Sequence, residues 1–434
     1  MKIAVLVYGL ERIGGIKKHA LSLCREYVAL GHQVDVWCVE YDRVNCYPNL
    51  VEGFQIHALR PARQLEESQT RKMLRGGIGA YLQTLWGFYE DQRQLSAIIP
   101  AGYDVIHPHG NMTSWAAAEY KRKYGTPVVW LSNDFIPIAS FHSNQPEKSL
   151  QALKRGLLKM ICAPIAAYDR WAVRSIDRIA VLRELVRTQI KDYYRRDAAV
   201  IRAGIDLPAY LYGDRCACRA CYGVKDETFL ILSVCSLMPH RRLEDIIHAV
   251  RDLVRQGQNV MYLIVGRTSQ DPAYAEYLHR EVQACGLTEE HVRFAGEVSE
   301  RELVDCYHAS DAFVWASDEN QTWGLAGMEA MAARKPVIVS DASGLAEVLT
   351  DGENALLVSP RSPDAIAASL NKLIANPQWA VRLGCRAQQL VRENFSWQKN
   401  AAEMVALFEE ASVTTRQSRG AALLRPYTTQ GTHS

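Results

Sequence analysis

The side chains best suited to chemistry lie in one fourteen-residue segment in the second half of the chain. The segment runs from Glu319 to Ala332 and reads Glu-Asn-Gln-Thr-Trp-Gly-Leu-Ala-Gly-Met-Glu-Ala-Met-Ala. We expect a strand over 312–315 to lead into its polar first half and a helix to open near Gly324. Free amides and a positive dipole end at such a helix N-terminus favour a diphosphate. Glu329, about one turn into that helix, could accept two hydrogen bonds from vicinal ribose hydroxyls.

Two further groups could contact phosphate oxygens. Arg241 and Arg242 follow a predicted strand, and a guanidinium can bind a phosphate through two parallel hydrogen bonds. Gly14 and Gly15 follow the first predicted strand, and residues this small let the backbone approach a phosphate closely. Each feature also has an ordinary interpretation, because a solvated basic pair and a tight turn need no ligand. Their order along the chain, together with Glu329, favours the functional interpretation.

The elements that must position these groups alternate along the chain. Short β-rich apolar runs are separated by helix-length segments, which is typical of parallel α/β sheets. In the first half we expect strands over 3–7, 34–39, 104–107, 127–131, 179–182 and 199–201, with helices over 14–30 and 149–173. In the second half we expect strands over 229–234, 261–265, 292–294, 312–315, 336–339 and 355–358. Two separate sheets predict two doubly wound domains.

The same series predicts the domain boundaries. We expect a first domain over 1–205, a second over 206–394 and a helix over 395–411, for which Ser396 is a candidate N-cap. The first part of the second domain, residues 206–226, has mixed charge with scattered proline and glycine, so it reads as a linker and entry segment. The tail over 412–434 is rich in Thr, Arg, Ser and Gly, which predicts disorder.

The composition of the 434 residues excludes several classes of protein. Charged residues make up 23% and hydrophobic residues 48%, which argues against a disordered, collagenous or coiled-coil chain. The formal net charge of +2 shows no general preference for polyanions, and no motif supports nucleic-acid binding. The eleven cysteines are too few for a disulfide scaffold and fit a reducing, cytoplasmic compartment. No apolar run approaches the roughly 18 residues that a membrane-spanning helix needs.

Three closely spaced cysteines raise the question of a metal site. Cys216, Cys218 and Cys221 have short spacings, but a structural zinc site usually takes four ligands from paired motifs. No second pair stands close in the sequence. We therefore expect these cysteines to pack as small apolar residues.

Two basic stretches could contact an anionic membrane. Residues 60–75 and 183–196 each carry five basic and two acidic residues, and Trp86, Phe88 and Tyr89 follow the first stretch. Basic and aromatic side chains together suit docking at a lipid interface. A solvated face is the ordinary interpretation of such runs, so peripheral membrane contact stays a hypothesis.

The segment over 319–332 resembles the retaining glycosyltransferases of family four, which have the GT-B fold. That fold consists of two doubly wound Rossmann-like domains facing across a cleft. The family typically has a Glu-Gly-Phe-Gly-Leu-like loop followed by Glu-Ala-Met-Ala. Glu329 matches the second glutamate of this pattern, and Gln321 stands where the first, which contacts the donor sugar, should be. The rest of the loop is matched by Thr322, Trp323, Gly324 and Leu325.

The resemblance extends to other parts of the donor side. Gly14 and Gly15 look like the family's amino-terminal glycine pair. Gly266 ends a strand that is similar to the family's Leu-Val-Gly-Asp-Gly strand end. Val298 closes the segment 292–298, which resembles the one whose backbone meets the nucleobase. The C-terminal helix resembles one that crosses back to the first domain.

The basic residues match the family less closely. Arg241 occupies the position of a lysine that holds the diphosphate in the family. Ser236 replaces an arginine that has the same role, and Arg242 could partly supply the missing charge. We therefore place Arg241 and Arg242 in the donor site by resemblance.

The acceptor side rests on the ends of two predicted strands. The run over 104–110 resembles the family's Asp-Val-Val-His-Ala-His, which places His109 at a strand end. The next strand ends in Ser132, Asn133 and Asp134, where many relatives have a histidine that contacts the sugar or acceptor. We expect His109, Asn133 and Asp134 to line the acceptor side, while a purely structural His109 stays open.

The resemblance implies an enzyme that transfers a sugar from a nucleotide-diphosphate sugar to an acceptor hydroxyl. Retention of anomeric configuration and independence of metals or cofactors are implied with it, and Arg241, Gln321 and Glu329 would be the catalytic residues. The acceptor would be a sugar or a lipid-linked sugar, and the protein would be cytoplasmic, with or without contact with the inner face of the membrane. Three alternatives remain: an epimerase or phosphorylase of the same architecture, a non-catalytic nucleotide-sugar-binding subunit, and a scaffold on lipid surfaces.

Overall fold

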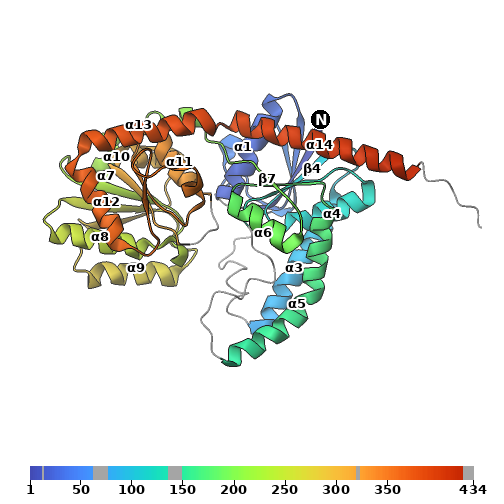
Figure 1. The fold of residues 1–434 in the computed structure, drawn as a ribbon, viewed down its shortest axis with the longest axis horizontal. Coiled ribbons are helices and arrows are strands. Elements are labelled where there is room, and N and C mark those ends of the chain that lie inside the picture. The colour runs from blue at the N-terminus through green and yellow to red at the C-terminus, as the bar shows by residue number, and fades with distance from the viewer. Residues whose placement is uncertain (12–13, 62–76, 135–148, 319–322, 424–434) are drawn as a thin grey trace, which may run out of the picture. The chain divides into compact units, whose positions relative to one another are not determined.

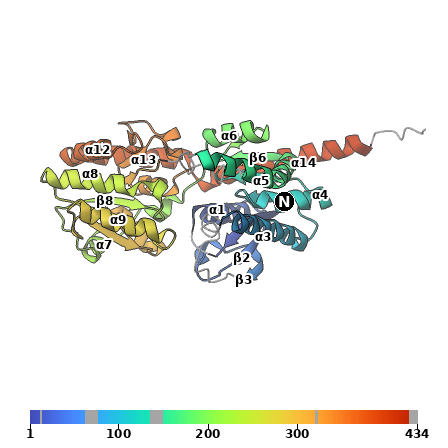
Figure 2. The same ribbon diagram turned by 90° about the horizontal axis from the view of Figure 1, so that it is seen from below.

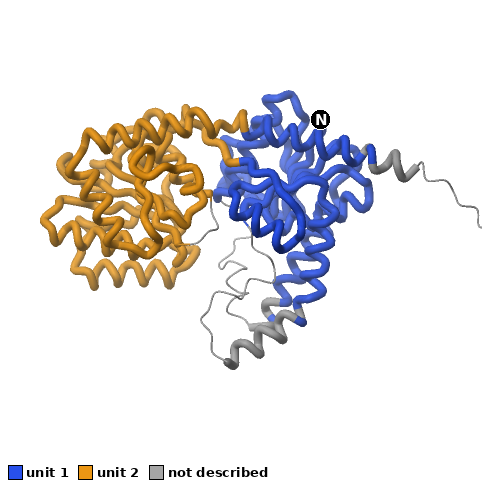
Figure 3. The backbone as a smooth tube through the Cα atoms, viewed as in Figure 1, with its two compact units in different colours: residues 1–201, 400–434 blue, residues 202–399 orange. Residues whose placement is uncertain are grey.

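The chain folds into two compact units, each built around one fully parallel sheet. The computed structural model describes residues 1–11, 14–61, 77–134, 149–318 and 323–423. Unit 1 comprises residues 1–201 and 400–434, and unit 2 comprises residues 202–399 (Figure 3). Helices connect the strands in both units, so the predicted fold class of two doubly wound α/β domains is confirmed (Figure 1).

The sheet of unit 1 has seven strands in the order β3-β2-β1-β4-β5-β6-β7. They are β1 (Lys2–Leu10), β2 (Gln33–Tyr41), β3 (Gln55–Pro61), β4 (Val105–His109), β5 (Val129–Ser132), β6 (Arg178–Val181) and β7 (Ala199–Val200). The edge strand β3 was not expected, since its residues are half-buried or exposed and form no apolar run. Strand order reverses between β1 and β4, where open α/β sheets leave a crevice at the carboxyl ends of the strands.

Helices cover both faces of this sheet. They are α1 (Gly15–Ala29), α3 (Gly77–Ile98), α4 (Thr113–Tyr124), α5 (Ser149–Ser175), α6 (Glu184–Tyr194) and α14 (Trp397–Leu423). Apolar residues of α3, α4, α5 and α6 share one core with the strands. On the other face, Phe408 of α14 packs against Tyr27 of α1 and His107 of β4, with ring centroids 5.5 and 5.0 Å apart. The C-terminal helix is therefore part of the core of unit 1.

The C-terminal helix is longer than we expected. It begins where predicted, because the Ser396 hydroxyl accepts a hydrogen bond from the Lys399 amide. It then continues to Leu423, so the expectation of disorder from residue 412 is wrong for 412–423, and residues 424–434 lie outside the described ranges. The Thr415 hydroxyl bonds the Asp177 carboxylate, and Thr414 accepts a hydrogen bond from Arg178. These contacts hold the polar end of the helix on unit 1.

The sheet of unit 2 has six strands in the order β10-β9-β8-β11-β12-β13. They are β8 (Phe229–Val234), β9 (Val260–Val265), β10 (Val292–Gly296), β11 (Ala312–Trp315), β12 (Val337–Ser340) and β13 (Leu356–Val358). The helices are α7 (Arg215–Cys221), α8 (Leu243–Arg255), α9 (Pro272–Ala284), α10 (Glu300–Ala309), α11 (Leu325–Ala332), α12 (Pro363–Ala375) and α13 (Pro377–Asn394). Figure 2 shows α8 and α9 beside strand β8, and both helices share one core with the sheet. The strand order reverses between β8 and β11, so the crevice of this unit lies there.

The segment that we read as a linker is an integral part of unit 2. Its helix α7 packs against α10, with the sulfur atoms of Cys218 and Cys306 3.7 Å apart. Arg219 is 2% exposed and donates to the carbonyl oxygens of Lys225 and Thr228. These bonds hold the segment within unit 2, and the boundary between the units falls at 201/202 rather than at 205/206.

The basic stretches are less free than the sequence indicated. Arg60 of β3 forms ion pairs with Glu40 at 2.8 Å and with Asp91 at 2.7 Å. In the second stretch, Arg187 pairs with Asp197 at 3.0 Å. Residues 62–76 of the first stretch lie outside the described ranges. Among the described residues, no helix is both long enough and apolar enough to cross a membrane.

Close packing of α13 on unit 2 gives a test of the fold. A Cβ atom at Gly384 would lie 2.1 Å from the carbonyl oxygen of Arg334, whereas one at Gly87 in α3 would meet no atom within 4 Å. Gly384→Ala should therefore lower the free energy of unfolding by about 1–3 kcal/mol. Gly87→Ala should leave it unchanged or raise it by about 0.5–1 kcal/mol. Urea unfolding of both variants measures this, and equal stabilities would contradict the packing of α13.

Candidate functional site

The crevice of unit 2 brings Arg241 to the end of strand β11. The Arg241 guanidinium lies 4.7 Å from the ring centroid of Trp315, the last residue of β11. The indole Nε1 of Trp315 is buried and has no hydrogen-bond partner among the described residues. A Cβ atom at Gly324, the N-cap of α11, would lie 3.9 Å from the same Nε1. A cation, an unused N–H donor and a helix N-terminus thus meet at one place, and all three favour an anion.

The start of α11 depends on glycine. Gly324 has φ +93°, a left-handed conformation that other residues adopt only with strain, and Leu325 then opens the helix. One turn on, a Cβ atom at Gly327 would lie 2.5 Å from Leu345 Cδ2. Trp323, which we expected in the donor loop, is 3% exposed and donates its indole N–H to the sulfur of Met328. The Trp323 side chain is therefore part of the core. Only the backbone of Trp323 could contact a ligand.

Two predicted residues of this loop cannot be placed. Gln321 and Thr322 lie outside the described residues, which resume at Trp323. Their proposed contacts with the donor sugar stay predictions from the sequence. The strand before them and the helix after them are where the sequence indicated.

Glu329 lies on the buried face of α11. It is 5% exposed, and its Oε2 accepts a hydrogen bond of 2.8 Å from the Tyr307 hydroxyl. Burial, followed by the neighbouring Glu329 carboxyl, raises the pKa of Tyr307 well above its ordinary value, so the phenol keeps its proton. Tyr307, which the sequence analysis did not assign to the site, therefore orients the carboxyl. A buried, oriented carboxyl is unlike the solvated helix glutamate of the ordinary interpretation.

Arg242 does not fit its predicted place in the donor site. Its guanidinium lies 2.6 Å from Glu244, 2.8 Å from Asp245 and 3.9 Å from Asp318. Three carboxylates surround this one cation and hold the start of α8, where Arg242 itself is the N-cap. Its charge therefore serves the fold, whereas the Arg241 guanidinium lies over the Trp315 ring.

The neighbouring strand end contributes a cation that we did not predict. A Cβ atom at Gly266 would lie 1.8 Å from the carbonyl oxygen of Cys235, so only glycine fits where the ends of β8 and β9 meet. The Leu237 amide donates to the carbonyl oxygen of Arg267, which places Arg267 beside the Ser236 position where the family arginine is missing. Arg267 pairs with the largely exposed Glu297 at 2.8 Å. Its position directly after a predicted strand was the signal that could have identified it.

The segment of Val298 continues from the same edge. Strand β10 ends at Gly296, and the Gly266 amide donates to the carbonyl oxygen of Gly296 at 2.8 Å. Val298 follows just before α10 and is half-buried. The predicted nucleobase segment and Gly266 therefore both follow the carboxyl ends of neighbouring strands.

In unit 1 the glycine pair lies at the start of α1. Gly14 is the N-cap of that helix and Gly15 its first residue. The Gly14 amide donates to the Tyr47 hydroxyl at 3.1 Å. A Cβ atom at Gly14 would meet nothing closer than 4.0 Å, so packing within unit 1 does not explain the glycine. Open space beside this helix N-terminus is compatible with the predicted ligand contact.

Three buried histidines cluster at the end of β4, one of the two strands at the reversal point of unit 1. His109 is the last residue of β4, with its ring 4.3 Å from that of His107 and 5.9 Å from that of His19 on α1. Neither ring nitrogen of His109 has a hydrogen-bond partner among the described residues. Burial lowers the pKa of His107 to about 4 and of His19 to about 3, and that of His109 well below its ordinary value. These rings are neutral at physiological pH. A neutral ring has one nitrogen that can donate a hydrogen bond to a hydroxyl and one that can accept a hydrogen bond from it.

The predicted partners of His109 lie close by. Asn133 is 4% exposed, and its amide nitrogen lies 3.2 Å from Nδ1 of His19. Asp134 follows the end of β5 and its carbonyl oxygen accepts a hydrogen bond from Ser132. The structure therefore brings His109 and Asn133 into one cluster, to which it adds His19 and His107. Those two histidines were not predicted, although His107 lies in the motif that identified His109.

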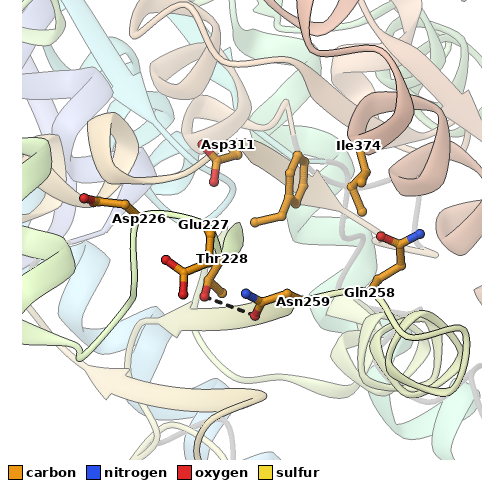
Figure 4. Close-up of a pocket in the computed structure, with 8 residues that line it drawn as sticks. Asp226, Glu227, Thr228, Gln258, Asn259, Asp311 and Ile374 are labelled. Atoms are coloured by element: carbon orange, nitrogen blue, oxygen red, sulfur yellow. Dashed lines mark hydrogen bonds between the residues drawn. The ribbon is translucent and has the colours of Figure 1, made fainter.

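A cavity of about 320 Å³ lies at the amino ends of the strands in unit 2, opposite to the carboxyl ends where the candidate site lies. Figure 4 shows its lining residues, among them Thr228, Asn259 and Asp311, at the amino ends of the strands. Asp311 bonds the Leu230 amide at 2.8 Å and pairs with Arg215 at 3.0 Å. Ligands of parallel sheets bind at carboxyl ends, so we assign this cavity to the fold and not to the candidate site.

The three cysteines of α7 do not form a common cluster. Cys216 and Cys221 are exposed, whereas Cys218 is buried against Cys306. In the described part of the chain, a different trio, composed of His248, Glu281 and Cys285, brings possible metal ligands within 4.8 Å of one another. None of the predicted site residues belongs to that trio.

Known proteins resemble this chain over nearly its whole length. The model described as Glycosyltransferase Family 4 matches residues 13–208, and that described as Glycosyl transferases group 1 matches residues 217–390. A D-inositol 3-phosphate glycosyltransferase from Nocardioides sp. is 24% identical over 420 residues, which cover 93% of this chain and 87% of that protein.

Solved structures with the same fold show a comparable coverage. Anabaena HepE in complex with UDP-glucose superposes with a TM-score of 0.68 at 19% identity, over 94% of this chain and 99% of that one. Sucrose-phosphate synthase from Thermosynechococcus elongatus gives a TM-score of 0.70 at 20% identity, over 95% and 99% of the two chains. These similarities show the GT-B fold.

The histidine cluster predicts how stability depends on pH. Below about pH 6.5 the unfolded chain protonates these histidines, whereas the folded chain does not until the pH nears their lowered pKa values. The free energy of unfolding should therefore fall between pH 6.5 and 5 by up to about 1.4 kcal/mol per pH unit for each histidine. Urea unfolding at several pH values should give a shallower slope for His107→Phe. An unchanged slope would contradict a neutral, buried His107.

Proposed function

The chain is a family-four-like glycosyltransferase of the GT-B fold that uses a nucleotide sugar, and we propose that its donor is a uridine diphosphate sugar bound by unit 2. Support for uridine comes from HepE, whose structures contain UDP, UDP with glucose, and UDP-glucose. The proposal extends to retention of anomeric configuration and to transfer without a bound metal, as the family resemblance implies.

One observation carries the donor assignment. Arg241, the unused Trp315 N–H and the N-terminus of α11 converge where the strand order of unit 2 reverses. As the bond between sugar and diphosphate breaks, negative charge grows on the departing diphosphate. Donors and cations already in place stabilise that charge without reorganisation. Arg241 and the α11 amides would bind the diphosphate, and Arg267 would add a second cation from the end of β9.

The remaining donor contacts would come from residues that follow the carboxyl ends of the strands in unit 2. Glu329, held by Tyr307, would accept hydrogen bonds from the ribose hydroxyls. Gln321 would orient the transferred sugar, and the backbone near Val298 would meet the nucleobase. The phosphate contact of Gly14 and Gly15 in unit 1 stays a prediction from the sequence.

We assign the acceptor side to the histidine cluster of unit 1. His109 and Asn133 are neutral hydrogen-bonding groups. The two ring nitrogens of His109 and the Oδ1 of Asn133 have no hydrogen-bond partner among the described residues. A neutral ring can orient a hydroxyl without taking its proton. In the same-face mechanism of retaining transfer, a phosphate oxygen of the donor accepts that proton, so the chain needs no dedicated base.

Thermal unfolding with nucleotides tests the donor assignment. UDP at about 100 times its dissociation constant should stabilise the protein by roughly 2.7 kcal/mol, and GDP and ADP should stabilise it less. Glu329→Ala should weaken UDP binding by about 1–3 kcal/mol, because the ribose hydrogen bonds are lost. Glu290→Ala, which removes an exposed carboxylate, is the matched control. Equal UDP affinity in Glu329→Ala would remove the ribose assignment, and no shift with any nucleotide would contradict the donor site.

The two neighbouring arginines should differ in what they affect. Arg241→Gln should slow release of UDP from UDP-glucose by about 10–100-fold, because the leaving group loses a charged hydrogen bond, and should leave stability within about 1 kcal/mol. Arg242→Gln should lower the free energy of unfolding by about 1–2 kcal/mol, since three carboxylates lose their partner at a partly exposed site. Turnover assays and urea unfolding of both variants measure this. The reverse pattern would exchange the roles assigned to the two residues.

A further inference from the structure

Unit 2 contains a group of polar side chains that the proposed donor chemistry does not use. Nε2 of His248 in α8 lies 3.0 Å from Oε2 of Glu281 in α9, and Cys285 directly follows the last residue of α9. One ligand atom of each residue lies within 4.8 Å of the other two. An imidazole nitrogen, a carboxylate oxygen and a thiolate sulfur are the ligands that zinc takes in proteins. We call these three residues the α8–α9 trio.

The core of unit 2 holds the two helices of the trio in place. Helices α8 and α9 pack against each other (Figure 2). Ile247, next to His248, and Val282, next to Glu281, are buried in the same apolar core. The Cys285 amide donates to the Glu281 carbonyl oxygen at 2.9 Å, so these two residues stand one helical turn apart on one face. The trio therefore joins two helices whose relative position is already fixed.

The spacing of the trio is close to that of a zinc site. Zinc lies about 2.0–2.2 Å from nitrogen and oxygen ligands and about 2.3 Å from sulfur, so in a tetrahedral site the ligand atoms are roughly 3.4–3.6 Å apart. The nitrogen of His248 and the oxygen of Glu281 are already nearer than this. A pair at the 4.8 Å limit would have to close by about 1.2 Å, which side-chain rotation at a half-buried site can supply.

The charges around the trio balance when a dication binds. The Glu281 carboxylate and a Cys285 thiolate together neutralise Zn²⁺. Arg251 also donates to the Cys285 sulfur, but its guanidinium pairs with Asp252 at 2.8 Å, so that pair adds no net charge. Tyr277 is hydrogen-bonded to the Glu281 carboxylate. Arg251 and Tyr277 are thus in place as outer partners of two metal ligands, and such partners orient the ligands that they contact.

The kinds of ligand atom in the trio select the metal. Mg²⁺ and Ca²⁺ take oxygen ligands, and the trio offers one carboxylate beside a nitrogen and a sulfur. A thiolate together with an imidazole favours zinc among the common divalent ions. The ordinary interpretation, a surface hydrogen bond between His248 and Glu281, gives the Cys285 thiol no role.

We infer that the α8–α9 trio binds one zinc ion, with a water molecule as the fourth ligand, and that this ion links α8 to α9 without contacting the sugar donor. As the Cys285 sulfur binds the ion, its S–H bond breaks and the proton goes to solvent. His248 and Glu281 bind through the two atoms that now share a hydrogen bond. The inference does not depend on the proposed transferase function.

Cobalt(II) tests the inference, because it adopts the geometry of zinc and absorbs visible light. The full chain is first treated with a chelator and a thiol reductant and then titrated with Co²⁺. One ion per chain should bind and give both a thiolate-to-cobalt charge-transfer band and the visible bands of a tetrahedral site. Zn²⁺ should remove these bands, whereas Mg²⁺ at roughly 100-fold excess should not. No thiolate band, or its removal by Mg²⁺, would overturn the inference.

Single substitutions locate the ion. Cys285→Ser should remove the thiolate band, and His248→Gln should weaken Zn²⁺ binding by more than the roughly 10–100-fold that loss of an outer partner costs. Cys385→Ser, which removes an exposed cysteine of α13, is the matched control and should bind as the wild type does. Urea unfolding without metal shows that each variant is folded. A thiolate band that survives in Cys285→Ser would place the ion elsewhere and overturn the inference.

Two further measurements separate this inference from the proposed function. Zn²⁺ should raise the urea midpoint of the wild type more than that of His248→Gln, because the complete trio exists only when α8 and α9 are folded together. UDP affinity should be the same with and without Zn²⁺, and a UDP affinity that depends on zinc would contradict an ion apart from the donor. Zinc binding without UDP binding would support the trio while contradicting the donor site. UDP binding without zinc binding would do the reverse.

Discussion

The candidate site depends on one constraint of parallel sheets, the reversal of strand order. Helices that leave neighbouring strands on opposite faces cannot cover the carboxyl ends between them, so a crevice must open at that point. In unit 1 the reversal lies between β1 and β4, where Gly14 follows the end of β1 and the buried His109 ends β4. In unit 2 it lies between β8 and β11 and exposes Arg241 and the start of α11. Residues far apart in the sequence are therefore brought together by topology before any side-chain contact is made.

Much of this framework could be predicted from the sequence, because buried parallel strands are short apolar runs. The bounds of β8 and β11 were predicted to the residue. The edge strand β3 was missed, since half-buried residues give no such run. The predicted C-terminal helix was too short, because its polar end is held by Asp177 and Arg178 at the start of β6, far away in the sequence. Contacts between segments remote in sequence leave no local signal, and they decided each of these differences.

The same limit applies to the site. Sequence could place Arg241 and Arg242 beside a phosphate, but only the fold shows that Glu244, Asp245 and Asp318 surround Arg242. It could identify Glu329 but not the Tyr307 hydroxyl that orients it. It could find His109 by its motif but not the burial that keeps the three rings neutral. Side chains that act on a ligand are readable in sequence, whereas those that hold them in place are not.

The central claim is that Arg241 binds the diphosphate of the donor. Calorimetric titration of UDP and UMP into the wild type and Arg241→Ala tests this claim most directly. The wild type should bind UDP at least tenfold more tightly than UMP, as a charged hydrogen bond to the second phosphate requires. In Arg241→Ala that ratio should fall toward one while the affinity for UMP stays the same. An unchanged ratio would contradict the account, because the second phosphate would then be bound elsewhere.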